Sequence, residues 1–118
     1  MTTLDDLHDL LVGKRDVSEE IPFGPDVLVY KVRGRVFALA AFKATPLRLS
    51  LKCDPLHALA LRAQYPAIQP GYHLNKRHWN TVTLDGSVPE EEFLAMIDES
   101  YRLAARGLPK ADRLALGV

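Results

Sequence analysis

The clearest pattern in the chain is a strict alternation of apolar and polar residues between Leu47 and Cys53. Leucines and the cysteine take the odd positions, and Arg48, Ser50 and Lys52 take the even ones. Successive side chains of a β-strand point to opposite faces of the sheet. The segment therefore predicts a strand with one buried leucine face and one polar face that carries cations.

Two similar segments precede it, over residues 28–33 and 36–42. Arg33-Gly34 lies between them and predicts a two-residue hairpin turn, because glycine readily adopts the positive φ that such turns need. This hairpin would place Phe37 opposite Tyr30. The register then predicts a core side with Phe37, Leu39 and Ala41, and an outer side with Val36, Ala38, Ala40 and Phe42.

A second hairpin is predicted over residues 70–84, with its turn at Asn75-Lys76-Arg77. Alternation would place some of its side chains on the core face and direct the others away from it. The expected core-facing residues are Tyr72, Leu74, Val82 and Leu84, and the expected outward ones are His73, Trp79, Thr81 and Thr83. The hairpin would thus present an indole and a basic tip to a binding partner.

Helical spacing of apolar residues predicts three helices. The first spans residues 4–12 and begins at Thr3, with Asp6 completing a capping box. The second spans about 55–64 and begins at Asp54-Pro55. Its predicted buried stripe is Leu56, Leu59, Ala60 and Ala63. The third begins near residues 87–90 and ends before Gly107, and residues 110–118 are expected to form a loose tail.

The predicted order is α-β(3)-α-β(2)-α, within a single domain that spans residues 1–118. Hairpin connections favour a five-stranded antiparallel sheet. With leucines on one side of the sheet and cations on the other, the helices would cover the leucine side alone. The predicted fold class is therefore an α+β, two-layer sandwich with one open sheet face.

The net charge of zero conceals a strong segregation of charge along the chain. Residues 27–80 carry nine cations and one acid, whereas the segments before and after them are acidic. One cysteine excludes an internal disulfide and argues against a cysteine-based zinc site. No apolar run has the length of a membrane span, and the first residues lack the pattern of a signal peptide. A cytoplasmic location is the expectation.

Several segments together resemble the YjbR/MmcQ-type family of small proteins described as DNA-binding. They are Phe23-Gly24-Pro25, Ser50-Leu51-Lys52-Cys53-Asp54-Pro55, Gln64-Tyr65-Pro66, Gly71-Tyr72-His73-Leu74-Asn75-Lys76-Arg77-His78-Trp79-Asn80-Thr81-Val82, Leu84-Asp85-Gly86 and Asp98-Glu99-Ser100-Tyr101. The resemblance implies a CyaY-like or secretion-chaperone-like fold with the element order given above. It also implies a "double wing" mode of binding, in which loops of the sheet grip the DNA duplex.

The leading functional hypothesis is accordingly DNA binding by the open sheet face and its hairpin loops. Cations neutralise phosphates, and an exposed aromatic ring stacks on a base. The candidate residues are Lys31, Arg33, Arg35, Lys43, Arg48, Lys52, His73, Asn75, Lys76, Arg77, His78 and Trp79. Because the isoelectric point is near 6.9, binding is expected to be weak and to have little sequence specificity.

The alternative is a protein-interaction or homodimerisation module that uses the same face. Its centre would be apolar, with a rim of cations, as in many protein interfaces. The expected apolar residues are Val29, Val36, Ala38, Ala40, Phe42 and Trp79.

An enzyme is not expected, and neither is a metal or another cofactor. Cys53 falls on the inward side of its strand and is interpreted as an inert core thiol. His8 and His57 lie in predicted helices without ligand-spaced carboxylates or cysteines nearby in the sequence. No phosphate-binding glycine loop appears.

Overall fold

The strand predicted most clearly, β4 (Arg48–Lys52), lies inside a six-stranded antiparallel sheet. The computed structural model describes residues 3–21, 26–71 and 74–118. Within them the strand order is β1-β2-β3-β4-β6-β5. The remaining strands are β1 (Val17–Glu20), β2 (Val27–Val32), β3 (Arg35–Ala41), β5 (Ile68–Pro70) and β6 (Trp79–Thr83).

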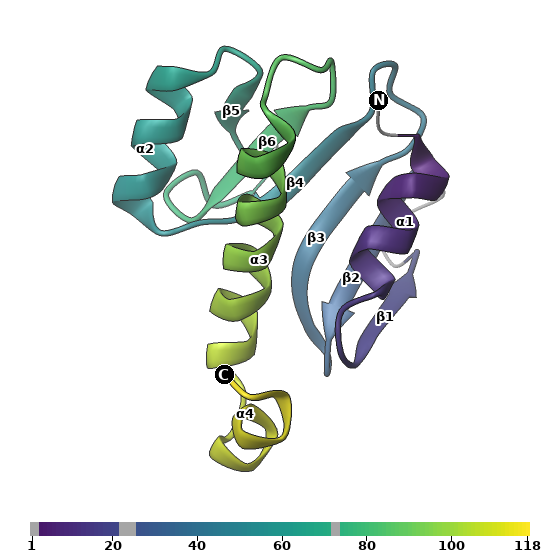
Figure 1. The fold of residues 1–118 in the computed structure, drawn as a ribbon, viewed down its shortest axis with the longest axis vertical. Helices are drawn as coiled ribbons and strands as arrows, with labels where there is room; N and C mark the ends of the chain where they lie inside the picture. The colour runs from purple at the N-terminus through teal and green to yellow at the C-terminus, as the bar shows by residue number, and fades with distance from the viewer. Residues whose placement is uncertain (1–2, 22–25, 72–73) are drawn as a thin grey trace.

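Among the described residues, three helices lie on one side of this sheet and the last one lies beyond its lower end (Figure 1). They are α1 (Leu4–Val12), α2 (Pro55–Gln64), α3 (Glu90–Arg106) and α4 (Lys110–Leu116). Figure 1 shows α1 over β1 and β2, α3 along the middle of the sheet, and α2 beside β5 and β6. The α+β class and the two-layer arrangement are therefore confirmed.

Local signals at two helix starts were interpreted correctly. Thr3 and Asp6 form the predicted capping box of α1, which satisfies two backbone N–H groups that lack partners inside the helix. Asp54 caps α2 by accepting a hydrogen bond from the backbone N–H of His57, and Pro55 occupies the first helical position.

Two elements correct the predicted count of five strands and three helices. The edge strand β1 has one apolar residue in four, so its sequence carries no alternation. It forms by pairing with β2 and through the Tyr30 hydroxyl, which donates a hydrogen bond to Glu19 at 2.8 Å. Residues 110–116 form α4 instead of a loose tail, with Leu116 buried and Asp112 paired with Arg33.

The second hairpin is shorter and differently placed than predicted. Its first strand, β5, ends at Pro70, where the sequence suggested that the strand begins. β5 pairs with β6 through Ile68↔Val82 and Pro70↔Asn80. The predicted turn is present at residues 75–78, where the His78 N–H donates to the Asn75 carbonyl at 3.2 Å, but it does not join two paired strands directly. The predicted core position of Tyr72 lies outside the described residues.

A β-bulge reverses the predicted faces of β3 from Ala38 onward, whereas Phe37 lies in the core as predicted. The Arg33-Gly34 turn is present, and Val32 pairs with Arg35 as expected. Between Tyr30 and Lys31, however, the register shifts, so that Tyr30 pairs with Ala38. Ala38 and Ala40 consequently belong to the core, whereas Leu39 belongs to the opposite face. An extra residue in one strand displaces every later side chain to the other side.

Ser100 of α3 stabilises the sheet where β3 and β4 separate beside the bulge. Its hydroxyl donates to the Phe37 carbonyl at 2.5 Å and accepts from the Lys52 N–H at 2.8 Å. Without Ser100 these two backbone groups would lack the partners that buried N–H and C=O groups require. The side chain is fully buried.

The predicted stripe of α2 was also wrong. Ala58 and Leu61 face the core, whereas Leu56 is 79% exposed and Leu59 58% exposed. Apolar residues occur on two faces of this helix, and the polar contacts of the helix indicate which face is buried. Arg62 on the inner side reaches Asn80 of β6, and this contact requires the observed orientation.

The core itself lies between the sheet and the helices. Phe37 contacts Tyr101 of α3 edge to face, with ring centroids 5.6 Å apart. Leu7 and Leu11 of α1 are fully buried.

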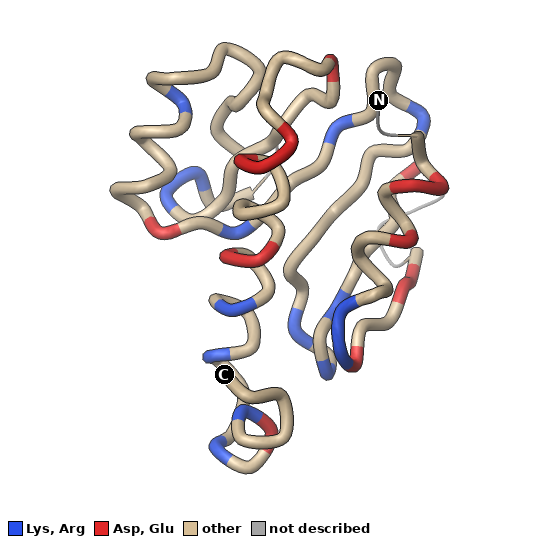
Figure 2. The backbone as a smooth tube through the Cα atoms, in the orientation of Figure 1, with Lys and Arg blue, Asp and Glu red and all other residues tan. Residues whose placement is uncertain are grey.

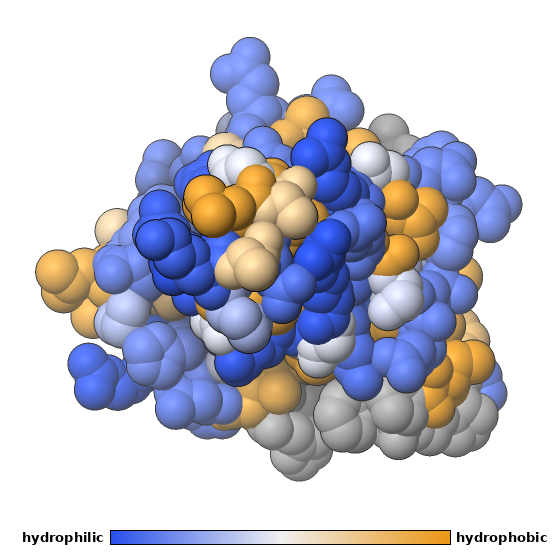
Figure 3. All heavy atoms as spheres, turned by 90° about the horizontal axis from the view of Figure 1, so that it is seen from below, coloured by the Kyte–Doolittle hydropathy of each residue, from blue (hydrophilic) through white to orange (hydrophobic). Residues whose placement is uncertain are grey.

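Seen along the long axis of the molecule from the α4 end, the surface is largely hydrophilic and its apolar side chains form small separate groups (Figure 3). Among the described residues, no helix has the length and apolar character needed to cross a membrane.

Candidate functional site

β4 and β6 carry the predicted polar row on the sheet face that faces away from the helices. Their pairing places Arg48 beside Thr83, Ser50 beside Thr81, and Lys52 beside Trp79. Leu49, Leu51 and Val82, which alternate with these residues, are buried in the core. The alternation noted in the sequence therefore predicts the two faces correctly for both strands.

A cation and an aromatic ring meet at one end of this row. The Lys52 Nζ lies 5.9 Å from the centroid of the Trp79 ring, a distance at which the ring quadrupole attracts the ammonium group. Trp79 is half-buried rather than fully exposed. Ser50 and Thr81 form a hydroxyl hydrogen bond of 2.8 Å in the middle of the row.

The other end of the row is hollowed. A shallow depression of about 290 Å³ lies beside Arg48. It is lined by Thr45, Pro46, Arg48, Gln69, Pro70, Thr81 and Thr83. Its walls are mostly polar or small, and the Arg48 side chain is exposed. The depression is thus suited to a polar group that accepts hydrogen bonds from a guanidinium.

The loop between β5 and β6 is organised by its own hydrogen bonds. The Asn75 side chain accepts from the Arg77 N–H at 2.9 Å, a local turn typical of asparagine. The Lys76 ammonium donates to the Gly71 carbonyl at 3.3 Å. A Cβ on Gly71 would lie 2.7 Å from the Trp79 Cβ, so only glycine fits there.

Arg62 of α2 supports this loop and was not among the predicted site residues. Its guanidinium donates to Asn80 Oδ1 at 2.6 Å, to the Trp79 carbonyl at 3.2 Å, and to the Lys76 carbonyl. Asn80 is fully buried. A cation that lies 14 residues before Lys76 gives no sequence signal for this contact, which exists only once α2 packs beside β6.

Several predicted cations have partners within the protein. Lys31 pairs with Glu20 at 2.9 Å, and Lys43 pairs with Asp26 at 2.9 Å. Arg33 pairs with both Asp16 and Asp112, and the hydrogen bonds that it donates to these carboxylates raise its pKa. Arg35 donates to the Gly107 carbonyl at 2.6 Å, at the C-terminus of α3.

The predicted residues thus divide into two groups (Figure 2). The turn between β2 and β3 carries Arg33, which pairs with acidic residues. Lys76 and Arg77 belong to the segment between β5 and β6, and Lys52 pairs with Trp79 at the start of β6. For Arg48, Lys52, Lys76 and Arg77 the described residues provide no ion pair within 4 Å. His78 is exposed next to Trp79, and His73 lies outside the described residues.

The structure corrects the expectation for His57. Its Nδ1 lies 2.7 Å from Glu99 Oε1 of α3, and the Cys53 Sγ lies 3.7 Å from the same oxygen. These ligand types are 42 and 46 residues apart in sequence and meet only through the packing of α3. Burial, then the negative charge of Glu99, raises the pKa of the Cys53 thiol to about 12. The thiol is therefore protonated at neutral pH.

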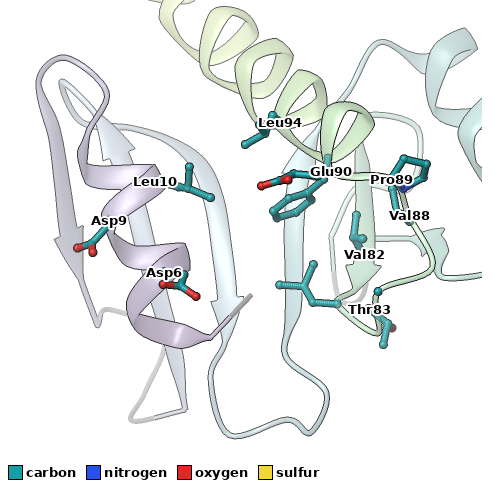
Figure 4. Close-up of a pocket in the computed structure, with 12 residues that line it drawn as sticks. Asp6, Asp9, Leu10, Val82, Thr83, Val88, Pro89, Glu90 and Leu94 are labelled. Carbon is teal, nitrogen blue, oxygen red and sulfur yellow. The ribbon is translucent and has the colours of Figure 1, made fainter. Parts of the chain in front are cut away.

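A larger cleft of about 610 Å³ lies on the helix side, between α1 and the start of α3 (Figure 4). Leu10 and Leu94 point toward it from the two helices, and Glu90 directs its carboxylate into the same space. Asp6 and Asp9 line it from α1. The cleft thus combines an apolar floor with an acidic rim.

Known proteins resemble the chain along almost all its length. It is 32% identical to the uncharacterized protein YjbR of Escherichia coli K12, over 97% of both chains. It is 38% identical over 93 residues to the uncharacterized protein YbdF of Escherichia coli O157:H7, covering 78% of this chain and 75% of the relative.

Solved structures agree. The crystal structure of protein DR2400 of Deinococcus radiodurans, with the family domain DUF419, superposes with a TM-score of 0.93 at 44% identity, covering 100% of this chain and 90% of that one. A Pseudomonas syringae protein superposes with a TM-score of 0.75 at 28% identity, over 87% and 99% of the two chains. The YjbR family model matches residues 12–103, and the chain therefore belongs to the YjbR family.

Proposed function

We propose that the protein binds nucleic acid through the end of the open sheet face where Lys52, Trp79 and the loop at Lys76-Arg77 meet. The observation that carries this proposal is the group of cations without carboxylate partners among the described residues, placed beside a half-exposed indole. Cations that already form ion pairs within the protein gain less from a phosphate, because they must first give up a partner.

The size of this group sets the expected strength of binding. Up to four phosphate contacts are possible, from Lys52, Lys76 and Arg77 at this end of the polar row and from Arg48 at its other end. Each contact with duplex DNA contributes about −0.9 to the slope of log affinity against log salt. The slope should therefore be no steeper than about −3.6, and binding should weaken strongly at physiological ionic strength.

Trp79 would provide the contact that is not electrostatic. Its backbone is fixed, because the Trp79 carbonyl accepts hydrogen bonds from the Arg62 guanidinium and the Gly71 N–H. Stacking of a base on an aromatic ring contributes about 1–3 kcal/mol and tolerates any base. The site is therefore expected to prefer single-stranded or distorted nucleic acid, with little sequence specificity.

A titration with fluorescent single-stranded and duplex oligonucleotides at several salt concentrations tests this function. The variant Lys76→Glu with Arg77→Glu should weaken binding and, at two lost phosphate contacts, flatten the salt slope by about 1.8 with duplex DNA and by about 1.4 with a single strand. A matched control, Arg102→Glu with Lys110→Glu, makes the same change in net charge on exposed positions of α3 and α4. If both variants lose affinity equally, net charge and not this site governs binding, and the proposal fails.

A protein partner is the second candidate, and the acidic cleft between α1 and α3 favours it. The open face offers less apolar surface than its sequence suggested, since Ala38 and Ala40 lie in the core and Val29 is buried. The cleft suits a cationic amphipathic segment, whose charges would complement Asp9 and Glu90. A labelled peptide of that kind should bind, and the variant Asp9→Asn with Glu90→Gln should weaken it. Equal binding of an uncharged peptide would contradict the role of the acidic rim.

A further inference from the structure

Three side chains with metal-binding atoms converge at the junction of β4, α2 and α3. Cys53 follows β4, His57 lies in the first turn of α2, and Glu99 lies in α3. One ligand atom of each lies within 4.8 Å of the other two. The group lies outside the polar row of the open face and outside both cavities described above.

We propose that Cys53, His57 and Glu99 form a binding site for a divalent transition metal of the zinc class. A thiolate, an imidazole and a carboxylate together are a ligand set that zinc accepts, whereas magnesium and calcium prefer oxygen ligands alone. Three protein ligands would leave one tetrahedral position for water or for another small ligand.

The distances suit this geometry after a small adjustment. Metal–ligand bonds of about 2.3 Å to sulfur and about 2.0–2.2 Å to nitrogen or oxygen, at tetrahedral angles, separate ligand atoms by roughly 3.3–3.7 Å. Cys53 Sγ and Glu99 Oε1 are already 3.7 Å apart. His57 Nδ1 and Glu99 Oε1 are 2.7 Å apart, so the two atoms would move apart slightly, and the neutral imidazole would bind the metal through Nδ1 with its proton on Nε2.

The surroundings hold the ligands in position. The backbone N–H of Asp54 donates to Glu99 Oε2 at 3.3 Å, which orients the carboxylate. The backbone N–H of Cys53 donates to the His78 carbonyl at 2.8 Å. Such outer hydrogen bonds are common behind metal ligands and strengthen binding.

Access and charge are also suitable. The side chain of His57 is 45% exposed and that of Glu99 17% exposed, so an ion can enter from the α2 side while the thiol remains buried. Asp54 and Glu99 add negative charge near the thiol, and Arg62 adds positive charge. Metal binding would release the thiol proton to solvent, because the thiolate is the form that binds.

The test uses the full chain freed of metal with a chelator, and Zn²⁺ and Co²⁺ as probes. Competition with a chromophoric chelator should show one Zn²⁺ per chain and release of a proton at neutral pH. Co²⁺ should give a thiolate-to-metal charge-transfer band and the ligand-field spectrum of a four-coordinate ion. Cys53→Ser should abolish the charge-transfer band, and His57→Gln and Glu99→Gln should each lower zinc affinity at least tenfold.

His8→Gln is the matched control, because it removes the other histidine–carboxylate pair, His8–Glu19, at α1. It should leave metal binding unchanged. His57 is a surface residue, so His57→Gln keeps the test valid even if Cys53→Ser fails to fold. Absence of stoichiometric binding in the parent protein overturns the site, and so does equal affinity in His57→Gln. In either case the three residues only connect α2 to α3 by hydrogen bonds.

Discussion

Both candidate sites depend on how α2 is oriented against the sheet, and a pair of leucine substitutions tests this orientation. Leu61 is 1% exposed and Leu59 is 58% exposed, although the apolar pattern of the sequence favoured Leu59 for the core. Leu61→Ala should lower the free energy of unfolding by about 2–5 kcal/mol, through lost burial and the cavity left behind. Leu59→Ala should change it by less than about 0.5 kcal/mol, as surface substitutions generally do.

Urea denaturation followed by circular dichroism measures the difference. With a slope of about 2 kcal/mol per molar urea, a loss of 3 kcal/mol lowers the midpoint by roughly 1.5 M. Residues 59 and 61 are separated by about 200° around a helix. If Leu59→Ala were as destabilising as Leu61→Ala, α2 would have to be rotated by nearly half a turn. His57 would then leave Glu99, and Arg62 would leave Asn80.

Two further predictions concern Ser100 and Cys53. Ser100→Ala should destabilise the protein by about 2–4 kcal/mol, because two buried backbone groups lose their partner at about 1–3 kcal/mol each. The better helix propensity of alanine offsets part of this loss. Thermal unfolding measures the change in stability, with Ser87→Ala at an exposed position as the control. For Cys53, the raised thiol pKa of about 12 means that the folded chain keeps a proton which the unfolded chain loses above about pH 8.5. The free energy of unfolding should therefore decrease as pH rises, by about 1 kcal/mol more between pH 8 and 9.5 than in Cys53→Ala. Parallel pH profiles of the two proteins would contradict a buried, protonated thiol.

Local signals account for the part of the fold that the sequence predicts correctly. The alternation from Leu47 to Cys53 depends only on the period of a strand, and the caps at Thr3 and Asp54 depend only on neighbouring residues. These elements position most of the polar row. Pairing of β4 with β6 then follows from two alternating segments that must bury the same face.

The errors come from interactions between distant segments. The bulge beside Tyr30 is stabilised by Ser100, which is 63 residues away from Phe37 in the sequence. The ion pairs of Arg33 with Asp16 and Asp112 likewise join separate elements, so counting cations along the chain overestimated the free basic surface. No period or cap signal encodes such contacts.

The loop at Lys76-Arg77 and the group around Cys53 are mechanically connected, which relates the two proposed sites. α2 carries both His57, which contacts Glu99, and Arg62, which donates to the Lys76 and Trp79 carbonyls. The connection also has a direct route, because the backbone N–H of Cys53 bonds to the His78 carbonyl. A ligand that shifts the backbone at His57 relative to Glu99 must therefore either bend α2 between its first and second turns or move the loop with it. Since α2 is continuous from Pro55 to Gln64 and an unbroken helix resists sharp bending, movement of the loop together with α2 is favoured.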